Sequence, residues 1–241
     1  MDLLMLPALN EARNLPPLIA AIDSMRVETS HPLHVLIIDD GSTDETAEVA
    51  ASLKQAHSWI HFVRHERNKG LGSAIRTGLA FARARDYRFA FVMDADLSQD
   101  PRDLPALRHA LEQHADLAIG SRYVRGGEME GVPIWRQIIS SSGNTVARLV
   151  LGIKVRDMTS GFRGFRVSTA GSLPFTETGY GIQLETVVKA AAAGLIIKEV
   201  PITLRLRKYG SSKLLYNFAF WRRYIKLFLR AWAWMHRKDL T

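Results

Sequence analysis

Residues 35–46 read VLIIDDGSTDET, a run of large apolar residues that ends abruptly in two aspartates and a turn sequence. Four consecutive apolar residues predict a strand that is buried on both faces, as in parallel sheets. The same pattern recurs at residues 91–101, FVMDADLSQDP, where the apolar run ends in Asp94 and Asp96. Two such strands, each followed by carboxylates, indicate an α/β fold whose polar site lies beyond the carboxyl ends of the strands.

Around these two stretches, short apolar runs alternate with amphipathic segments. The predicted strands are residues 3–6, 35–38, 62–63, 89–93 and 117–119, and the predicted helices are near residues 15–26, 43–55, 72–85 and 103–113. Ser42, with Glu45 three residues later, predicts a capping box at the start of the second helix. The alternation is typical of βαβ units in a mostly parallel sheet with helices on both faces.

Beyond residue 120 the pattern changes. The expected order is a helix near 134–151, a glycine-rich piece at 161–166 (GFRGFR), a helix around 181–193, a strand near 196–204 and a final helix over about 213–237. The sequence contains no internal repeat, low-complexity tract or long linker. We therefore expect one continuous domain with a C-terminal extension.

The charge of the chain is concentrated at one end. The 241 residues carry a formal net charge of +8, but residues 203–241 alone hold ten basic side chains and one acid, which leaves the rest at −1. A nearly neutral body argues against a nucleic-acid-binding surface, and the basic tail indicates an anionic partner. The chain has no cysteine, which excludes disulfides, thiolate nucleophiles and Cys-ligated metal sites.

The strand-end carboxylates predict a ligand site. In an extended segment alternate residues point the same way, so Asp94 and Asp96 can face one ligand together. Two carboxylates this close repel each other unless a cation lies between them, and a hard divalent ion that also binds a diphosphate fits this place. A single strand-end aspartate more often caps a turn. The second cluster, Asp39-Asp40, on a neighbouring strand favours the ligand site.

Other enzyme classes use similar strings. A phosphatase signature, D-x-D-x-T, resembles DADLS at 94–98, but its order relative to the second acidic pair is reversed here. A dinucleotide-binding fold would place G-x-G-x-x-G after the first strand, whereas GLGSAI at 70–75 lacks the third glycine and follows the third strand. Both alternatives are therefore weaker than a metal–diphosphate site.

Nine motifs in order give the sequence a family resemblance. The motifs are PALNE (7–11), IIDDGSTDET (37–46), NKGLGSAIRTG (68–78), DADLS (94–98), GSRYVRGG (120–127), WRQIISSSGN (135–144), DMTSGFRGFR (157–166), GYGIQLE (179–185) and EVPITLRLRKYGSSK (199–213). With these motifs the sequence resembles the inverting GT-A glycosyltransferases of family 2, of the dolichol-phosphate mannose synthase type, over roughly residues 3–215. The resemblance implies a Rossmann-like GT-A catalytic domain over 1–212 and a basic amphipathic C-terminal helix over 213–241.

The resemblance also assigns roles to the donor side of the site. It implies a nucleotide pocket formed by Pro7, Leu9, Glu11, Ile38 and Asp40. It implies a diphosphate and metal site for Mg²⁺ or Mn²⁺ at Asp94, Ala95 and Asp96, with Ser98 as a further metal contact, and a C-terminal grip on the donor diphosphate by Arg207 and Lys213. The family usually has Tyr in place of Leu9 and often Asp in place of Leu206, which leaves the preferred nucleotide open.

On the acceptor side, the resemblance implies phosphate contacts from Arg122, Arg136 and Ser140. The residues expected to carry catalysis are Asp94, Asp96, Arg122, Arg136 and Arg207. Arg136 and Ser140 are four apart on a predicted helix, so both project from one face and can share an anion. A polyprenyl phosphate is already ionised near neutral pH, since its second pKa is about 6, so it needs no catalytic base. The sequence indeed offers no obvious Ser–His nucleophile.

The tail fits a lipid acceptor. On a helix from residue 213, the basic residues Arg222, Lys226 and Arg230 share one arc, opposite a wide apolar face that includes Trp221 and Trp232. This is typical of a helix lying in a membrane interface with anionic headgroups; docking on the chain's own domain is the alternative. No signal peptide or membrane span of about 20 residues is evident. We expect a cytoplasmic protein, peripherally associated with the cytoplasmic face of a membrane.

The leading hypothesis is therefore transfer of mannose from GDP-mannose to a polyprenyl phosphate of the dolichyl type. The nearest alternative is the same reaction with UDP-glucose or another UDP-sugar. A phosphatase and a non-catalytic membrane adaptor are the alternatives from other classes. The expected partners are the nucleotide-sugar donor, the polyprenyl phosphate and an anionic membrane surface, without nucleic acid. The sequence leaves open the sugar, the base, the polyprenol and any separate membrane-anchoring subunits.

Overall fold

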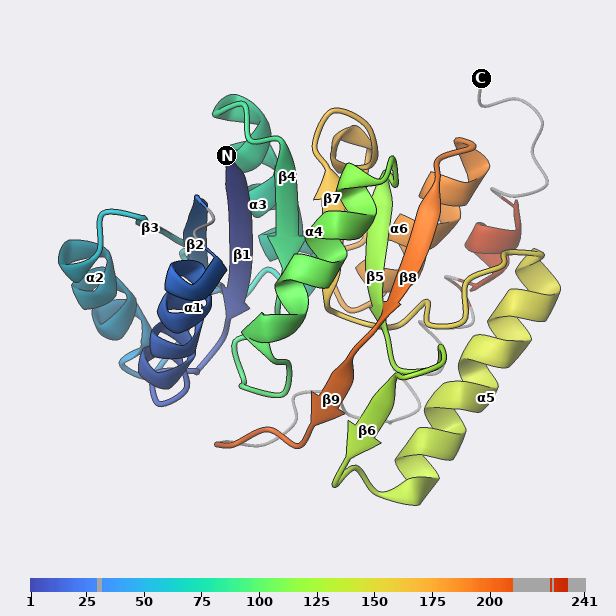
Figure 1. Cartoon of the computed structure of the whole chain (residues 1–241), viewed down its shortest axis with the longest axis horizontal. Coiled ribbons are helices and arrows are strands. Elements are labelled where there is room, and N and C mark those ends of the chain that lie inside the picture. The colour runs from blue at the N-terminus through green and yellow to red at the C-terminus, as the bar shows by residue number, and fades with distance from the viewer. Residues whose placement is uncertain (30–31, 210–225, 227, 234–241) are drawn as a thin grey trace.

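A seven-stranded sheet forms the centre of the computed structural model, which describes residues 1–29, 32–209, 226 and 228–233 (Figure 1). The strand order is β3-β2-β1-β4-β7-β5-β8. The strands are β1 (Asp2–Ala8), β2 (Leu33–Asp39), β3 (Ile60–Arg64), β4 (Phe89–Val92), β5 (Leu117–Ser121), β7 (Arg163–Arg166) and β8 (Ile197–Pro201). All pairs are parallel except the two that β7 makes with β4 and β5. The predicted mostly parallel sheet is confirmed.

Helices cover both faces of this sheet, as predicted. They are α1 (Leu15–Thr29), α2 (Thr46–Ala56), α3 (Leu71–Ala84), α4 (Leu104–Glu112), α5 (Ile134–Leu151) and α6 (Ile182–Ala192). In Figure 1, α1 and α4 lie in front of the sheet, α3 and α6 lie behind it, and α5 stands at its side.

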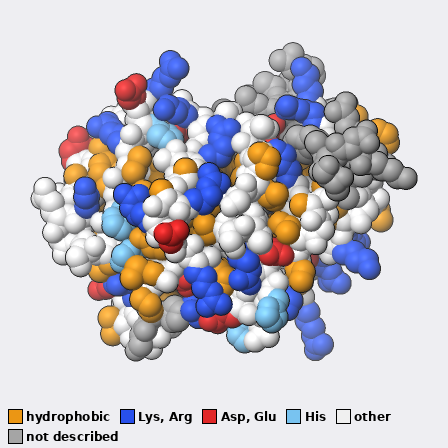
Figure 2. Space-filling model, turned by 90° about the horizontal axis from the view of Figure 1, so that it is seen from above, with side chains coloured by type: hydrophobic (Ala, Val, Ile, Leu, Met, Phe, Trp, Pro, Cys, Tyr) orange, Lys and Arg blue, Asp and Glu red, His pale blue; other side chains and the backbone are white. Residues whose placement is uncertain are grey.

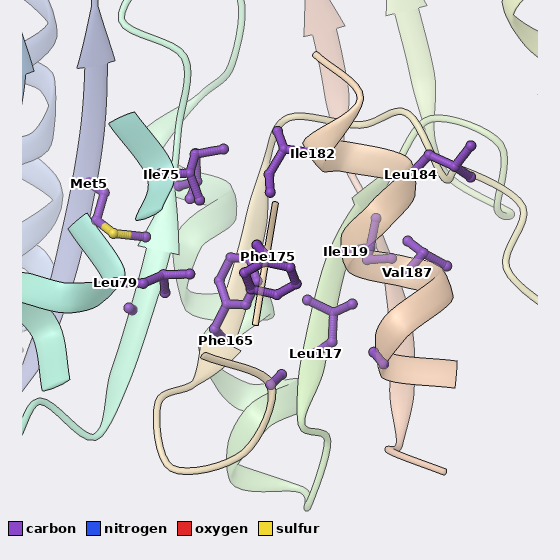
Figure 3. Packing of buried hydrophobic residues seen from close by; sticks show 14 of the residues in the cluster. Met5, Ile75, Leu79, Leu117, Ile119, Phe165, Phe175, Ile182, Leu184 and Val187 are labelled. Atoms are coloured by element: carbon purple, nitrogen blue, oxygen red, sulfur yellow. The ribbon is translucent and has the colours of Figure 1, made fainter. Parts of the chain in front are cut away.

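Two separate cores result from the alternation of side chains along each strand. On β1, Leu3 and Met5 pack into the core beneath α3 and α6, while Leu4 and Leu6 pack beneath α1 and α4. Figure 3 shows the first core, where side chains of α3 and α6 converge around a phenylalanine pair. The four side chains of β1 are fully buried, which fixes the register of the central strands and hence the position of their carboxyl ends.

The glycine-rich piece at 161–166 contains a strand that we did not predict. In β7, Phe165 enters the core under α3 and α6, and Phe162, one residue before the strand, enters the other. A Cβ atom on Gly164 would lie 2.8 Å from the ring of Phe91 on the adjacent β4, so this strand can only pass with glycine there. Gly164 is therefore required by close packing between two strands.

The predicted single strand at 196–204 is two strands. After β8, the chain leaves the main sheet at Pro201, and β9 (Thr203–Arg205) pairs in parallel with β6 (Glu128–Glu130) in a separate two-stranded sheet. Between them Ile202 is buried against Gly120, where a Cβ atom would lie 2.8 Å from its side chain. Through this small sheet the chain passes from the core to the candidate functional site.

The predicted capping box at Ser42 is wrong. Helix α2 begins at Thr46, and the Ser42 hydroxyl instead accepts a hydrogen bond from the backbone N–H of Asn10, at 2.9 Å. The Asp44 carboxylate takes over near the helix start and accepts from both the N–H and the hydroxyl of Thr46. A long-range contact with the loop after β1 therefore outweighs the local signal.

Most of the predicted C-terminal helix lies outside the described residues. Within it, residues 228–233 are helical, with Ala231 buried in the core beneath α3 and α6 and Arg230 3.2 Å from the carboxylate of Glu177. In the part of the chain that the structure describes, no helix has the length and hydropathy needed to cross a membrane. The division at residue 212 stays a prediction.

Candidate active site

A cavity of about 380 Å³ opens beyond the carboxyl ends of β1, β2 and β4. It is lined by eight of the predicted donor residues: Pro7, Leu9, Glu11, Asp40, Asp94, Ala95, Asp96 and Arg207. Its remaining walls come from the loop before α3, the start of α3 itself and the segment that leads into α6. We call it the donor cavity, after the role that the sequence resemblance predicts for these residues. The sequence placed these residues together correctly, because parallel strands bring their carboxyl ends to one edge.

One of the predicted donor residues that the structure describes does not line this cavity. Ile38 is fully buried in the core, where its side chain faces Gly78 of α3, 3.1 Å from the position of a Cβ atom on that glycine. Ile38 lies within β2, where the side chains are packed in the core. The first residue after it along the chain that lines the cavity is Asp40. Assigning Ile38 to the pocket is therefore corrected. Lys213 lies outside the described residues.

Asp40 shapes the wall of the donor cavity. One carboxylate oxygen accepts from Nδ1 of His65 at 2.6 Å and from the backbone N–H of Lys69 at 2.9 Å, and the other accepts from the N–H of Gly70 at 2.7 Å. Nε2 of His65 in turn contacts the hydroxyl of Thr77 at 3.0 Å. Sequence reasoning missed His65, since a lone histidine carries no signal until its carboxylate partner is known.

The Asp-x-Asp pair is held by hydrogen bonds from its own loop. Oδ1 of Asp96 accepts from the backbone N–H and the hydroxyl of Ser98, at 3.0 and 2.6 Å, and Oδ2 of Asp94 accepts from Nε2 of Gln99 at 2.8 Å. Between the two ends of this turn, Leu97 adopts a left-handed backbone with φ of 64°, which is strained for a bulky residue. Ser98, predicted to contact a metal, orients Asp96 in this structure.

The electrostatics of this pair favour a cation. Burial and, after it, the charge of Asp96 raise the pKa of Asp94 to about 7. Gly161, from the TSGFR motif, passes so close that a Cβ atom there would lie 2.8 Å from Oδ2 of Asp94. In the described part of the chain, no group of three or more His, Cys, Asp or Glu side chains could hold a metal. Asp94 and Asp96 are only two such side chains, so a divalent ion held by them would need substrate oxygens to complete its coordination.

A second cavity of about 460 Å³ meets the first at these aspartates. Both are lined by Asp94, Asp96, Tyr180, Gln183 and Arg207. The second cavity brings together all three residues predicted for the acceptor phosphate, Arg122, Arg136 and Ser140. The apolar part of its lining consists of Met129, Val132, Ile202, Leu204 and Leu206. We call it the acceptor cavity.

Arg136 carries an unsatisfied donor. Its Nε is buried and has no hydrogen-bond partner among the described residues, while its guanidinium lies 5.1 Å from the ring centre of Trp135. Ser140 follows one turn later on α5 and lines the same cavity. A buried N–H without a partner is costly, so its presence here indicates a place for an anion.

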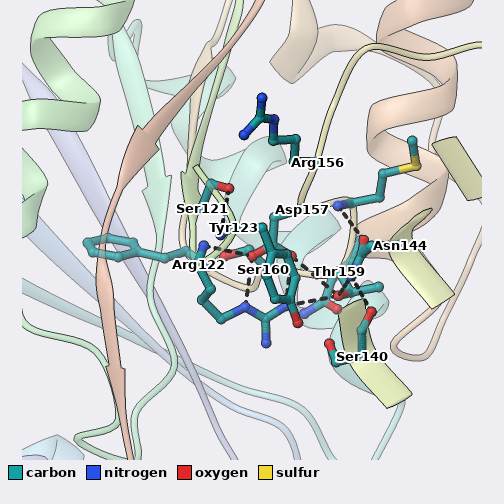
Figure 4. Close-up of polar contacts among 12 residues, drawn as sticks. Ser121, Arg122, Tyr123, Ser140, Asn144, Arg156, Asp157, Thr159 and Ser160 are labelled. Atoms are coloured by element: carbon teal, nitrogen blue, oxygen red, sulfur yellow. Dashed lines mark hydrogen bonds and ion pairs between the residues drawn. The ribbon is translucent and has the colours of Figure 1, made fainter. Parts of the chain in front are cut away.

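Unlike Nε of Arg136, the guanidinium of Arg122 has hydrogen-bond partners among the described residues, as Figure 4 shows. Its Nε and Nη2 form a bidentate pair with the carboxylate of Asp157, both at 2.7 Å, and Nη2 also donates to the hydroxyl of Thr159 at 2.9 Å. Burial alone would raise the pKa of Asp157, but the hydrogen bonds and charge of Arg122 outweigh it and lower that pKa. The charge of Arg122 is thus largely neutralised within the protein. Asp157 lies within one of the nine motifs, but the sequence alone assigns it no role.

Asn144 is a further residue that the sequence did not single out. It lies on α5, is 2% exposed, and its Oδ1 accepts from the backbone N–H of Met158 at 2.7 Å. Its Nδ2 donates to the hydroxyl of Thr159 at 3.0 Å and to the carbonyl of Ser140 at 2.9 Å. These bonds tie α5 to the loop that carries Asp157.

The outer face of α5 is apolar. Its large exposed side chains are Ile134, Trp135, Ile138, Ile139, Val146, Leu149 and Val150, with exposures from 39% to 74%. On the face seen in Figure 2, by contrast, the described Lys and Arg side chains are dispersed, with hydrophobic and acidic ones between them. An amphipathic helix that turns such a face outward beside the acceptor cavity is unusual for a helix packed only on its own domain.

Solved structures share this fold. Glucosyl-3-phosphoglycerate synthase from Mycobacterium tuberculosis, in complex with phosphoglyceric acid, aligns with a TM-score of 0.71 over 97% of this chain and 80% of that one, at 23% identity. The same enzyme in complex with Mn²⁺, UDP and phosphoglyceric acid aligns equally well, over 96% and 78%, at 21% identity. This likeness defines the fold class: the protein has the GT-A fold, with the Asp-x-Asp pair at the strand ends.

Sequence relatives narrow the class. Residues 4–172 match the family described as glycosyl transferase family 2, and the chain belongs to that family. It is 36% identical over 217 residues to polyprenol monophosphomannose synthase of Mycolicibacterium smegmatis, covering 88% of this chain and 80% of the relative. It is 34% identical over 215 residues to undecaprenyl-phosphate mannosyltransferase of Micrococcus luteus, covering 88% and 86%. It is 35% identical over 212 residues to dolichol-phosphate mannosyltransferase of Pyrococcus furiosus, covering 87% of this chain but 58% of that protein.

Proposed function

We propose that this chain transfers a mannosyl residue from GDP-mannose to a polyprenyl phosphate of the dolichyl type, with inversion, at the cytoplasmic face of a membrane. The observation that carries the proposal is the acceptor cavity, which combines the unsatisfied Arg136 with apolar lining residues and meets the donor cavity at Asp94 and Asp96. An ionised phosphate attached to a long apolar chain matches both halves of this lining. The three named relatives act on substrates of this kind.

The donor cavity suits a nucleoside diphosphate sugar. Asp94 and Asp96 would hold Mg²⁺ or Mn²⁺, which when bound neutralises charge on the diphosphate leaving group. The raised pKa of Asp94 supports this fit, because two crowded carboxylates are stabilised by a cation. Arg207, which lines both cavities, is placed to stabilise the departing nucleoside diphosphate.

The chain's residues position rather than activate the nucleophile. Arg136 and Ser140 would bind two oxygens of the acceptor phosphate and leave the third to attack the sugar. Because that oxygen is already ionised near neutral pH, no residue has to remove a proton. Alignment of the two bound substrates across the shared aspartates then supplies most of the rate acceleration.

The membrane would lie against the outer face of α5. The exposed apolar side chains of this helix and the basic C-terminal helix predicted over 213–241 would both contact the lipid that carries the acceptor. The assignment of residues 1–212 to the catalytic domain and of the rest to membrane contact is part of this proposal, as is any requirement for separate membrane-anchoring subunits.

A transfer assay tests the proposal. The protein is incubated with labelled GDP-mannose, undecaprenyl or dolichyl phosphate and Mg²⁺ or Mn²⁺, and label is measured in the lipid extract. We expect mannosyl lipid with the wild type and a loss of about a hundredfold or more with Asp96→Asn. The exposed Arg156→Ala serves as a matched control, since this arginine does not line either cavity. Absence of labelled lipid with every nucleotide sugar would contradict the proposal.

The same assay run with UDP-glucose separates the nearest alternative. Glucosyl-3-phosphoglycerate synthase, which shares the fold, has been crystallised with UDP-glucose, and Leu9 leaves the base contact undefined here. Thermal-shift measurements with GDP- and UDP-sugars plus Mn²⁺ rank the donors, because a ligand raises apparent stability according to its affinity. A larger shift with UDP-glucose than with GDP-mannose would favour the alternative.

A further inference from the structure

Helix α5 carries two residues that line the acceptor cavity, Arg136 and Ser140, but no residue in its first half is buried in the core. The buried residues of this helix are Asn144, Ala147 and Leu151, all in its second half. Arg136 and Ser140 lie before them, on turns whose outer side chains are exposed. Asn144 is therefore the first point at which the helix is fixed to the core.

Asn144 is attached to the catalytic core by side-chain hydrogen bonds. Its Oδ1 accepts from the N–H of Met158, and its Nδ2 donates to the Thr159 hydroxyl, at 2.7 and 3.0 Å. A third hydrogen bond, from Nδ2 to the carbonyl of Ser140, links the same amide to the turn that carries an acceptor residue. A buried amide whose oxygen and nitrogen both form hydrogen bonds fixes its helix in one orientation.

Thr159 joins this anchor to the other side of the acceptor cavity. Its hydroxyl accepts from Nη2 of Arg122 at 2.9 Å as well as from Asn144. Arg122 is in turn locked by Asp157. One chain of hydrogen bonds therefore runs from α5 through Thr159 to Arg122, and Figure 4 shows these side chains converging from three segments of the sequence.

We propose that Asn144 is a positioning residue for the acceptor phosphate, acting with Thr159 to set the distance between Ser140 on α5 and Arg122 on the core. This inference rests on the proposed function and names the device that builds its acceptor subsite. Asn144 does not line the acceptor cavity, so it acts through the residues that do. A displacement of about 1 Å at a reacting group can cost on the order of a hundredfold in rate.

The test is a double-mutant cycle with Asn144→Leu and Thr159→Val. Each variant removes one end of the bond between α5 and the core while keeping a similar volume. We expect each to lower kcat/KM for the polyprenyl phosphate by about tenfold or more, with affinity for GDP and Mn²⁺ changed less than about twofold. The double variant should be little worse than Asn144→Leu alone, because that variant already removes the bond to Thr159.

Two further variants serve as controls. Thr159→Ser retains the hydroxyl and should restore most of the acceptor kcat/KM, and Thr145→Ala, at the exposed neighbour of Asn144, should leave it unchanged. Equal losses for donor and acceptor, or fully additive effects in the double variant, would overturn the positioning role.

Direct binding of farnesyl phosphate separates this inference from the proposed function. A wild type that binds farnesyl phosphate but transfers no sugar contradicts the proposed function, while the binding loss in Asn144→Leu still decides the positioning role. The positioning role is overturned if the wild type does not bind this lipid phosphate, or if Asn144→Leu and the wild type bind it equally well.

Discussion

Nη2 of Arg207 lies 2.6 Å from Oδ2 of Asp96, so a guanidinium contacts the second aspartate of the Asp-x-Asp pair. The other oxygen of this carboxylate already accepts two hydrogen bonds from Ser98. A metal ion that binds Asp96 through Oδ2 therefore competes with Arg207 for this oxygen. Displaced from Asp96, the Arg207 guanidinium can contact the diphosphate that arrives with the metal. Metal and nucleotide binding should consequently favour each other.

Substitution of Arg207 tests this competition. In Arg207→Ala, Mn²⁺ alone should bind about fivefold more tightly, because the competing cation is gone, with the modest gain expected of a partly exposed ion pair. GDP in the presence of Mn²⁺ should bind about tenfold more weakly, because one cation that would contact the diphosphate is lost. Electron paramagnetic resonance of free Mn²⁺ and calorimetry with GDP measure the two effects. The control is Arg102→Ala, whose side chain is 75% exposed and pairs with Asp100 instead. Unchanged Mn²⁺ affinity in Arg207→Ala would contradict the competition.

Replacement of the Asp94 carboxyl by an amide should stabilise the fold at the expense of function. Burial and the charge of Asp96 raise its pKa to about 7 from an ordinary 3.8. The folded state therefore holds a proton that the unfolded chain releases, so the cost to stability grows as pH rises from about 4 to 7 and stays at its maximum above that.

In metal-free protein with EDTA at about pH 8, the Asp94→Asn variant should therefore unfold at a higher temperature than the wild type. Its free energy of unfolding should be larger by on the order of 2 kcal/mol. The asparagine can still accept from Gln99. At about pH 4 the two proteins should be equally stable, because the wild-type carboxyl is protonated in the folded state. Scanning calorimetry measures both. A variant less stable than the wild type at pH 8 would contradict this assignment.

The two arginines of the acceptor cavity should respond differently to substitution. Arg122→Ala leaves Asp157 buried and unpaired, which typically costs about 3–5 kcal/mol of folding free energy. Arg136→Ala removes a side chain whose Nε has no described partner, so it should change stability by less than about 0.5 kcal/mol. Its effect should instead be a rise of about tenfold or more in KM for the polyprenyl phosphate. Urea unfolding and acceptor kinetics on both variants provide the comparison, and a large stability loss in Arg136→Ala would argue against an anion site.

The order of strands and helices in the first 120 residues could be predicted because it depends on local apolar periodicity. β7 could not, since its strand character comes from the close approach of Gly164 to Phe91, which lies 73 positions earlier in the chain. The start of α2 was misplaced for a related reason. The Ser42 hydroxyl looked like a cap, but its partner is the backbone of Asn10.

For the site, sequence reasoning found the carboxylates and cations but not the residues that hold them. Asp94, Asp96 and Arg136 lie in recognisable motifs and line the predicted cavities. His65 and Asn144 act through partners on other segments of the chain, so neither leaves a periodic or compositional signal. Ile38 was misassigned because it is adjacent to a site residue along the strand, where burial changes from one position to the next.

The central claim is that the acceptor cavity selects a phosphate carried by an apolar chain. The most direct test offers labelled GDP-mannose, with Mn²⁺, to equal concentrations of farnesyl phosphate and phosphoglyceric acid, a hydrophilic phosphate bound by the structural relative. The apolar part of the cavity lining and Arg136 together predict label only in farnesyl phosphate, with the amount falling about tenfold or more in Arg136→Ala. Label in phosphoglyceric acid, with none in farnesyl phosphate, would contradict the account.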